Sequence, residues 1–159
     1  MDVKPPGEEE GTLADQIVLA MTDLVGAMGR LNDLVAQRLG VGPTDLLCLH
    51  TLNREGPSTA GALSARLGRT TGAITQMVDR LQKAGYVRRR PHPEDRRSVV
   101  IEAIPDALGK VAALYTGLDA RSRRLMAEFT EDQLAAVHAF LAASHHNAVQ
   151  ESDNLTAQP

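Results

Sequence analysis

The chain has 159 residues, of which 43% are hydrophobic, so it is long enough for one globular domain with an appended element. Its single cysteine, Cys48, excludes an intrachain disulfide, and no run of apolar residues approaches the ~18 that a membrane span needs, so we expect a soluble, cytoplasmic protein. The net charge is −3, but the window from Arg66 to Arg97 holds nine basic and three acidic residues, which gives this window +6 and leaves −9 for the rest. This asymmetry indicates either one anion-binding face on an acidic body or a solvated basic surface.

The N-terminal part of the chain is a polar segment followed by helix. Residues 1–11 contain two prolines and three consecutive glutamates but no apolar stretch, so we expect a disordered tail and not a signal peptide. From Leu13 to Val35 apolar residues recur at intervals of three and four, which predicts a long amphipathic helix over 12–39. Glycine and proline at 40–43 end this helix, and a second helix is predicted from 43 to about Arg54.

The centre of the chain has the pattern of two short helices joined by a glycine turn. Ser58 is placed to cap a third helix, on which Leu63 and Leu67 share one face. Gly68 supplies the turn, because glycine tolerates the left-handed conformation that a tight turn requires. Thr70 or Thr71 then caps a fourth helix, which residues 84–85 end. This order is typical of a helix-turn-helix.

After the fourth helix the hydrophobic period changes to that of strands. Residues 86–90 are predicted to form one strand and residues 98–103 its partner, since β-branched side chains favour strands. A polar, proline-rich loop over 91–96 joins them. A basic hairpin directly after a helix-turn-helix is a wing, so the predicted fold class is mostly α with a small β-hairpin wing.

Two more helices are predicted after the wing. Pro105 starts the first of them, at a position where its missing N–H is harmless, and this helix runs to about Glu128. Thr130 and Gln133 fit a capping box for the last helix. From about Asn147 the sequence is polar, and we expect a flexible tail over 147–159.

The fourth helix carries the clearest chemical signal. Its apolar side chains share one face, and the opposite face carries Thr71, Thr75, Gln76 and Arg80. In a major groove, threonine can contact the methyl group of thymine and glutamine can pair bidentately with adenine. Free N–H groups at the helix start, together with Ser58, suit a phosphate. An ordinary surface helix with a mixed polar face is the structural alternative.

The predicted wing concentrates arginine on a narrow protrusion. Such side chains suit phosphate contacts and insertion into a minor groove, whose negative potential attracts them. Asp95 can hold the guanidinium of Arg97 in one geometry through a charge-assisted pair. A solvated charged hairpin is the alternative. The wing arginines are Arg88, Arg89, Arg90, Arg96 and Arg97.

The segments TQMVDRLQKAGYVRR and PEDRRSVV, within residues 63–101, resemble the MarR (multiple-antibiotic-resistance regulator) family. The family's Asp-x-Arg wing motif falls on Asp95 and Arg97. Over about residues 13–145 the resemblance implies a recognition helix at about 70–84, a wing at about 87–103 and a dimer interface made by the first and last helices. The sequence EAIPDALGKV departs from the family's commoner Leu-Thr-x-x-Gly junction after the wing, and we expect Pro105 to take the place of that junction.

The resemblance implies a homodimeric, sequence-specific regulator that binds a pseudo-palindromic double-stranded DNA operator. Many members are repressors released by a small, often aromatic anion, so we expect repression relieved by such an effector. The predicted domains are a helical dimerisation region over 12–42 and 105–146 and a winged helix-turn-helix over 43–104. The predicted DNA-binding residues are Ser58, Thr70, Thr71, Thr75, Gln76, Arg80, Arg88, Arg89, Arg90, Asp95, Arg96 and Arg97.

Other functional classes have little support in the sequence. It contains no glycine-rich phosphate loop, zinc-binding His-Glu-x-x-His motif or nucleophile elbow, so we expect neither an enzyme nor a cofactor, and its histidines lack the spacing of metal ligands. Two alternatives remain open. One is a winged-helix module that binds protein and not DNA, and the other is a thiol-responsive regulator acting through Cys48.

Overall fold

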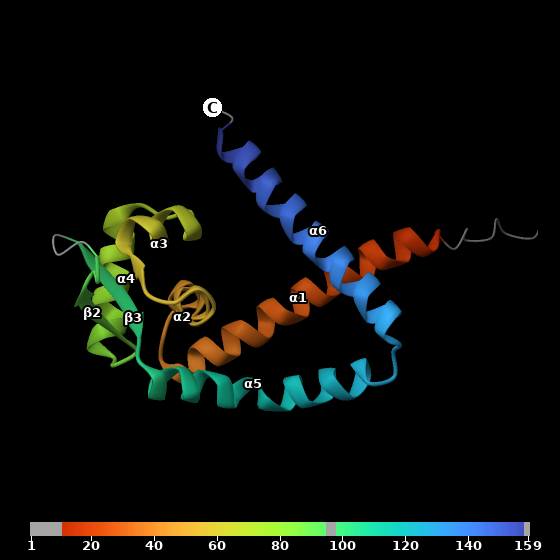
Figure 1. The fold of residues 1–159 in the computed structure, drawn as a ribbon, viewed down its shortest axis with the longest axis horizontal. Coiled ribbons are helices and arrows are strands. Elements are labelled where there is room, and N and C mark those ends of the chain that lie inside the picture. Colours follow the sequence, from red (N-terminus) through yellow and green to blue (C-terminus); the bar gives the residue numbers. More distant parts are fainter. Residues whose placement is uncertain (1–10, 95–97, 158–159) are drawn as a thin grey trace, which may run out of the picture. The chain divides into compact units, whose positions relative to one another are not determined.

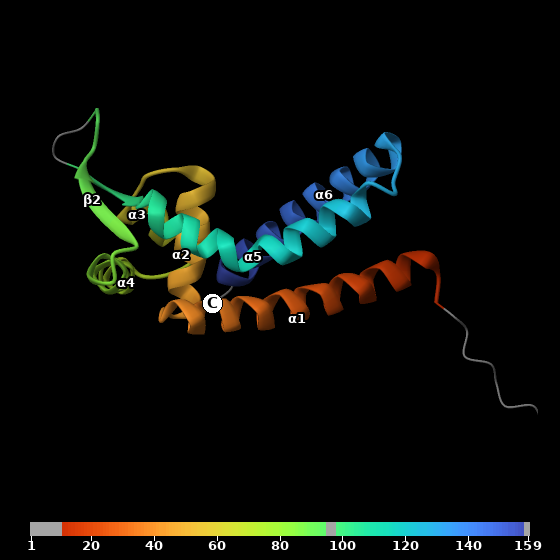
Figure 2. The ribbon, with the colours of Figure 1, turned by 90° about the horizontal axis from the view of Figure 1, so that it is seen from below.

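The computed structural model describes residues 11–94 and 98–157, and within them it is mostly helical with one small antiparallel sheet (Figures 1 and 2). The chain divides into two compact units, Met1–Ala113 and Leu114–Pro159. No helix among the described residues is both long and apolar enough to cross a membrane. The elements are α1 (Leu13–Leu39), α2 (Pro43–Glu55), β1 (Ser58–Thr59), α3 (Ala60–Leu67), α4 (Thr71–Lys83), β2 (Val87–Pro91), β3 (Val99–Ala103), α5 (Pro105–Met126) and α6 (Glu131–Ala157).

The predicted first helix is confirmed, and its ends have clear local causes. The Thr12 side chain accepts a hydrogen bond from the Asp15 N–H at 3.3 Å, and the Asp15 carboxylate accepts one from the Thr12 N–H at 2.8 Å. This reciprocal capping box satisfies two N–H groups that the helix itself cannot pair. At the other end Gly40 has φ 69°, in the left-handed region that favours glycine.

The core of the first unit lies between α2, α3, α4 and the sheet. Each helix contributes fully buried aliphatic side chains, and β2 adds one more, so the short helices are held by packing and not by intrinsic propensity alone. Tyr86 ties this assembly to the end of α1, because its hydroxyl donates a hydrogen bond to the Leu39 carbonyl at 2.9 Å. The largest fully buried side chains are Leu46, Leu49, Leu63, Ile74, Val78, Leu81 and Val87.

The wing is confirmed, but its sheet has three strands and not two. The order is β1-β3-β2, with Arg90 opposite Val100 and Ser58 opposite Ile101. Because Ser58 pairs in the sheet, the prediction that it caps the third helix is wrong. Thr59 caps α3 instead, with its side chain accepting a hydrogen bond from the Ala62 N–H at 3.2 Å.

The two C-terminal helices begin where the sequence predicts. Pro105 starts α5, and Thr130 and Gln133 form the predicted capping box, with hydrogen bonds of 2.9 and 3.3 Å. The predicted helix end near Asn147 is wrong, since α6 continues to Ala157. Its last turns contain neither glycine nor proline, so nothing in the local sequence stops the helix.

Candidate nucleic-acid interface

Helix α4 presents one polar face to solvent because its opposite face is buried. Ile74, Met77, Val78 and Leu81 are buried, at the three- and four-residue spacing of a single helix face. This packing fixes the rotation of α4 about its axis. The predicted base-reading residues are therefore all exposed and share the outward face: Thr71, Thr75 and Gln76.

The start of α4 is shaped by two threonine hydroxyls. Thr70 caps the helix, accepting a hydrogen bond from the Ala73 N–H at 3.3 Å. One turn later the Thr75 hydroxyl donates to the Thr71 carbonyl at 3.0 Å. Because this proton is used inside the helix, Thr75 offers a partner its methyl group and its oxygen lone pairs.

The buried carboxylate of Asp45 binds Arg80, which lies near the C-terminal end of the exposed face of α4. The Arg80 guanidinium donates to Asp45 at 2.7 Å, and the side chain of Asp45 is only 5% exposed whereas that of Arg80 is 60% exposed. The other Asp45 oxygen accepts the Gly42 N–H at 3.1 Å, at the start of α2. Asp45 also raises the pKa of Arg80, through this hydrogen bond first and its charge second. One carboxylate thus caps α2 and fixes a side chain of α4.

The arginines on strand β2 alternate between the two faces of the sheet. The Arg89 guanidinium reaches α4, where it donates to Asp79 at 2.6 Å and to the side-chain oxygen of Gln82. Arg88 and Arg90 lie opposite Glu102 and Val100 of β3, on the other face. Among the wing arginines that the structure describes, Arg89 alone is joined directly to the exposed surface of α4.

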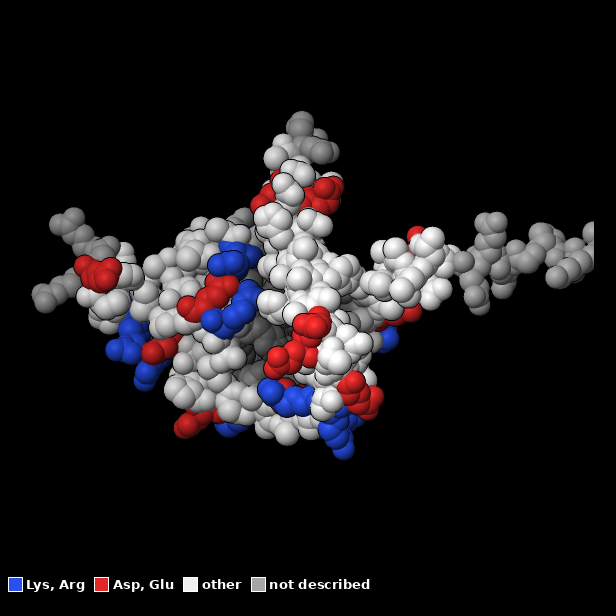
Figure 3. Space-filling model, turned by 45° about the vertical axis from the view of Figure 1, so that its right-hand side comes forward, with Lys and Arg blue, Asp and Glu red and all other residues white. Residues whose placement is uncertain are grey.

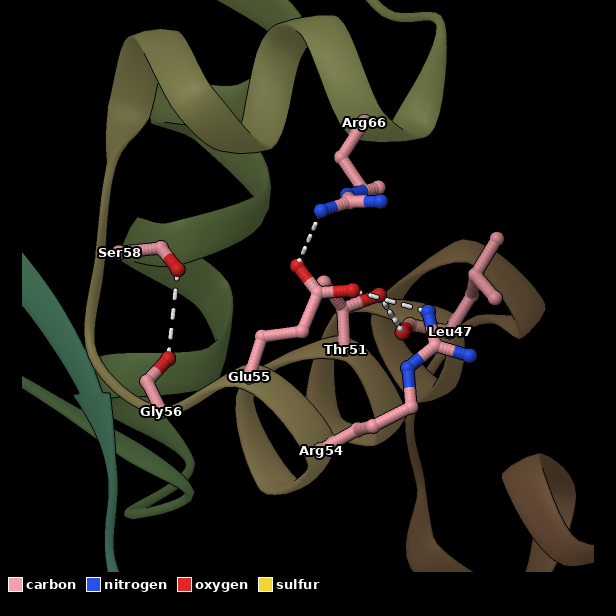
Figure 4. A network of polar contacts seen from close by, with 7 residues as sticks. All are labelled: Leu47, Thr51, Arg54, Glu55, Gly56, Ser58 and Arg66. Atoms are coloured by element: carbon pink, nitrogen blue, oxygen red, sulfur yellow. Dashed lines mark hydrogen bonds and ion pairs between the residues drawn. The ribbon is translucent and has the colours of Figure 1, made fainter.

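Ser58 lies apart from the arginine-bearing strand, in β1. It is half-buried, and its hydroxyl donates to the Gly56 carbonyl at 3.2 Å. In the same region Figure 4 shows Glu55 between two arginines, with Arg66 at 2.8 Å and Arg54 at 2.9 Å. Phosphate binding by Ser58 stays a prediction. The predicted contacts Asp95, Arg96 and Arg97 lie outside the described residues.

The amino-acid sequence alone does not reveal the acidic partners of these arginines. Asp45 and Arg80 are 35 residues apart, so no local spacing pairs them. Glu102 could have been suspected, because once the hairpin register is known it lies opposite Arg88. On the face drawn in Figure 3, basic and acidic side chains lie beside one another in small mixed groups.

The lone cysteine has the surroundings of a core residue. Cys48 is 0% exposed on α2. Burial, and secondarily the charge of Asp45, raises the pKa of its thiol to about 12. A thiolate is the reactive form of cysteine, so this environment disfavours the thiol-responsive alternative. Among the described residues no group of three or more histidine, cysteine or acidic side chains is arranged to hold a metal ion.

These features define a winged helix-turn-helix: α3 and α4 form the helix-turn-helix, and the β2–β3 hairpin forms the wing. The sequence profile of the MarR family matches residues 42–99, which include the helix-turn-helix and strand β2 and end at the first residue of β3. The uncharacterized HTH-type transcriptional regulator YcgE of Bacillus subtilis is 39% identical over 124 residues, which cover 78% of this chain and 80% of YcgE. The chain belongs to the MarR family of transcriptional regulators, and it is a DNA-binding regulator and not an enzyme.

Two further comparisons agree with this assignment. The HTH-type transcriptional repressor MdtR of Bacillus subtilis is 24% identical over 120 residues, covering 75% of this chain and 77% of MdtR. The crystal structure of the transcriptional regulator Tm0710 from Thermotoga maritima aligns with a TM-score of 0.62 at 20% identity, covering 91% of this chain and 99% of Tm0710. At 20% identity this structural similarity supports the fold and not a shared function.

The contact between Asp45 and Arg80 leads to a stability prediction. Asp45→Asn keeps the shape of the side chain but removes the charge that Arg80 pairs with. Because Arg80 is largely exposed, we expect a loss of about 1–2 kcal/mol in the free energy of unfolding, measured by urea denaturation. The control Asp33→Asn, at an exposed position of α1, should stay within about 0.5 kcal/mol of the unsubstituted protein. Equal stabilities of the two variants would contradict the assigned role of Asp45.

The environment of Cys48 leads to a second prediction. At pH 8 the thiol should be almost wholly protonated, because its pKa is about 12. We expect the native protein to react with a disulfide reagent such as Ellman's reagent only slowly, and the same protein in denaturing urea to react at the rate of a free cysteine. Fast labelling of the native protein at pH 8 would restore the thiol-responsive alternative.

Proposed function

We propose that the chain binds a pseudo-palindromic double-stranded DNA operator as a homodimer and represses transcription, and that a small-molecule ligand releases it. The main support for DNA binding is the exposed face of α4, on which Thr71, Thr75 and Gln76 lie. Arg89 of the wing is joined to the same helix through Asp79. This face is polar, and its first turns carry small and amide side chains that suit a helix entering a major groove.

In this proposal the contacts fall into two classes. Thr71, Thr75 and Gln76 contact base edges, where glutamine can pair with adenine and threonine can contact the thymine methyl. The remaining residues position the protein on phosphates or enter the minor groove, and they supply most of the salt-dependent affinity. These are Ser58, Thr70, Arg80, Arg88, Arg89, Arg90, Arg96 and Arg97, with Asp95 orienting Arg97.

The proposal of a homodimer rests on apolar side chains that a single chain leaves in water. On α1 Leu13 is 72% and Val25 70% exposed, and on α6 Leu141 is 49% exposed. Exposed apolar side chains of this kind favour a protein interface on each helix. We assign residues 12–42 and 105–146 to this dimerisation region. A two-fold axis then places the two recognition helices on half-sites about one DNA turn apart.

Repression is supported by the name of one relative, the transcriptional repressor MdtR. A ligand can release DNA only through a coupling free energy, by favouring a spacing of the two recognition helices that no longer fits two successive major grooves. The proposed effector is a small anion, often aromatic in the family that the sequence resembles.

The proposed function is tested by fluorescence anisotropy with duplex fragments from beside the protein's own gene, at two salt concentrations. We expect tight, salt-sensitive binding. Arg89→Ala should weaken binding to all sequences and reduce the salt slope by about 1 for each protomer bound. Gln76→Ala should cost about 1–3 kcal/mol on the preferred sequence and relax the preference at one base position.

Arg30→Ala is the matched control, once size-exclusion chromatography has shown that its oligomeric state is unchanged, since it removes one exposed cation from α1, outside the proposed DNA surface. It should leave both affinity and salt slope unchanged. Absence of binding to these fragments, followed by failure of a random-sequence selection, would favour a winged helix that binds protein. Equal losses in Arg30→Ala and Arg89→Ala would show that the wing has no special role.

A further inference from the structure

The outer face of the wing carries two arginines that share one carboxylate. Glu102 of β3 accepts a hydrogen bond from the Arg88 Nε at 2.7 Å, and its two oxygens lie 3.1 and 3.2 Å from Nη1 of Arg90. Arg88 lies directly opposite Glu102 in the sheet, and Arg90 is two residues further along β2. The side chains of Arg88 and Arg90 are 52% and 57% exposed, so other anions can reach them.

Two cations held on one anion leave this face with a net charge of +1 instead of +2. The pKa of Glu102 is lowered, mainly by the hydrogen bonds from Arg88 and then Arg90, so the carboxylate stays charged at neutral pH. Arg90 and Glu102 also line an open groove of about 330 Å³, together with Pro57, His92 and Val100 among others. Glu102 therefore competes for the two guanidinium groups at a surface that solvent and dissolved anions reach.

The strength of this competition follows from the exposure of the pairs. Exposed ion pairs are weak, so a phosphate can displace the carboxylate from these arginines. A phosphate that binds Arg88 or Arg90 must still do so next to a fixed negative charge. The other described wing arginine, Arg89, is held on the opposite face by Asp79 and Gln82, so it is independent of Glu102.

We propose that Glu102 limits the DNA affinity of the wing by occupying Arg88 and Arg90 in the free protein, so that DNA phosphates bind these arginines in competition with it. Glu102 is then an affinity-setting residue that itself contacts no DNA. This inference rests on the proposed function, because it concerns the arginines that the proposal assigns to phosphate.

The test compares Glu102→Gln with Glu94→Gln, which removes one negative charge from the same hairpin without changing the Arg88–Glu102–Arg90 group. Glu102→Thr is a second uncharged variant, and threonine favours strands, so one poorly folded variant does not end the test. Each protein is measured on duplex DNA at several salt concentrations and by the salt concentration at which it elutes from immobilised heparin, after its thermal unfolding midpoint has been checked.

Glu102→Gln should bind duplex DNA about fivefold more tightly at low salt, with a steeper salt dependence, and should elute later from heparin. Glu94→Gln should change these values much less. The gain should vanish when Arg88 and Arg90 are both replaced by alanine. Unchanged or weaker binding by both Glu102 variants, an equal gain in Glu94→Gln, or a gain that persists without the two arginines would each overturn the inference.

The heparin measurement separates the two proposals. If the unsubstituted protein binds no duplex DNA, the proposed function fails. The elution of the Glu102 variants from a polyanion still shows whether this carboxylate masks the arginines. A late elution of Glu102→Gln together with tight binding of the unsubstituted protein to DNA supports both proposals.

Discussion

The recognition surface depends on one buried carboxylate. Asp45 accepts the N–H that starts α2 and the guanidinium of Arg80 on α4, two groups that are far apart in sequence. Apolar packing already sets which face of α4 is buried, but packing is tolerant of small shifts of a helix. A charge-assisted hydrogen bond to a buried carboxylate that also caps α2 is more directional. We infer that this bond restricts the position of α4 along its neighbours, and with it the placement of Thr75 and Gln76.

The positive charges of the hairpin are paired with nearby carboxylates. Each described arginine of the hairpin has an acidic partner, with Arg89 on Asp79 and both Arg88 and Arg90 on Glu102. Such pairs hold long side chains in defined positions and keep a basic surface from binding every polyanion it meets. In the proposed function this balance has a role, because the affinity for DNA must stay weak enough for the proposed ligand to release the protein.

The sequence predicts the elements well where local chemistry decides them. Glycine at 40 and 68, proline at 105 and the capping threonines at 70 and 130 mark helix ends that the structure confirms. Two errors have the same origin, which is the absence of a local signal. Strand β1 has only two residues and exists because β3 offers it a partner, and α6 continues past Asn147 because nothing stops it.

The candidate site was predictable in part. Helix periodicity identifies which side chains of α4 face outward, since that depends only on its apolar face. The ion pairs could not be predicted, because they join residues that only the fold brings together. Arg80 is an example: the sequence assigns it to phosphate, and the structure places it on Asp45 with 60% of its side chain still exposed. Its five donors allow both partners at once, so the two assignments are compatible.

The most direct test is a double-mutant cycle on Asp45 and Arg80, with DNA affinity as the quantity measured. The proteins are the unsubstituted chain, Asp45→Asn, Arg80→Gln and the double variant. If Asp45 acts by holding Arg80, each single change weakens binding and the double variant loses much less than the sum, with a coupling of at least about 0.5 kcal/mol. Additive losses, or a loss confined to Arg80→Gln, would show that Asp45 does not position the recognition helix.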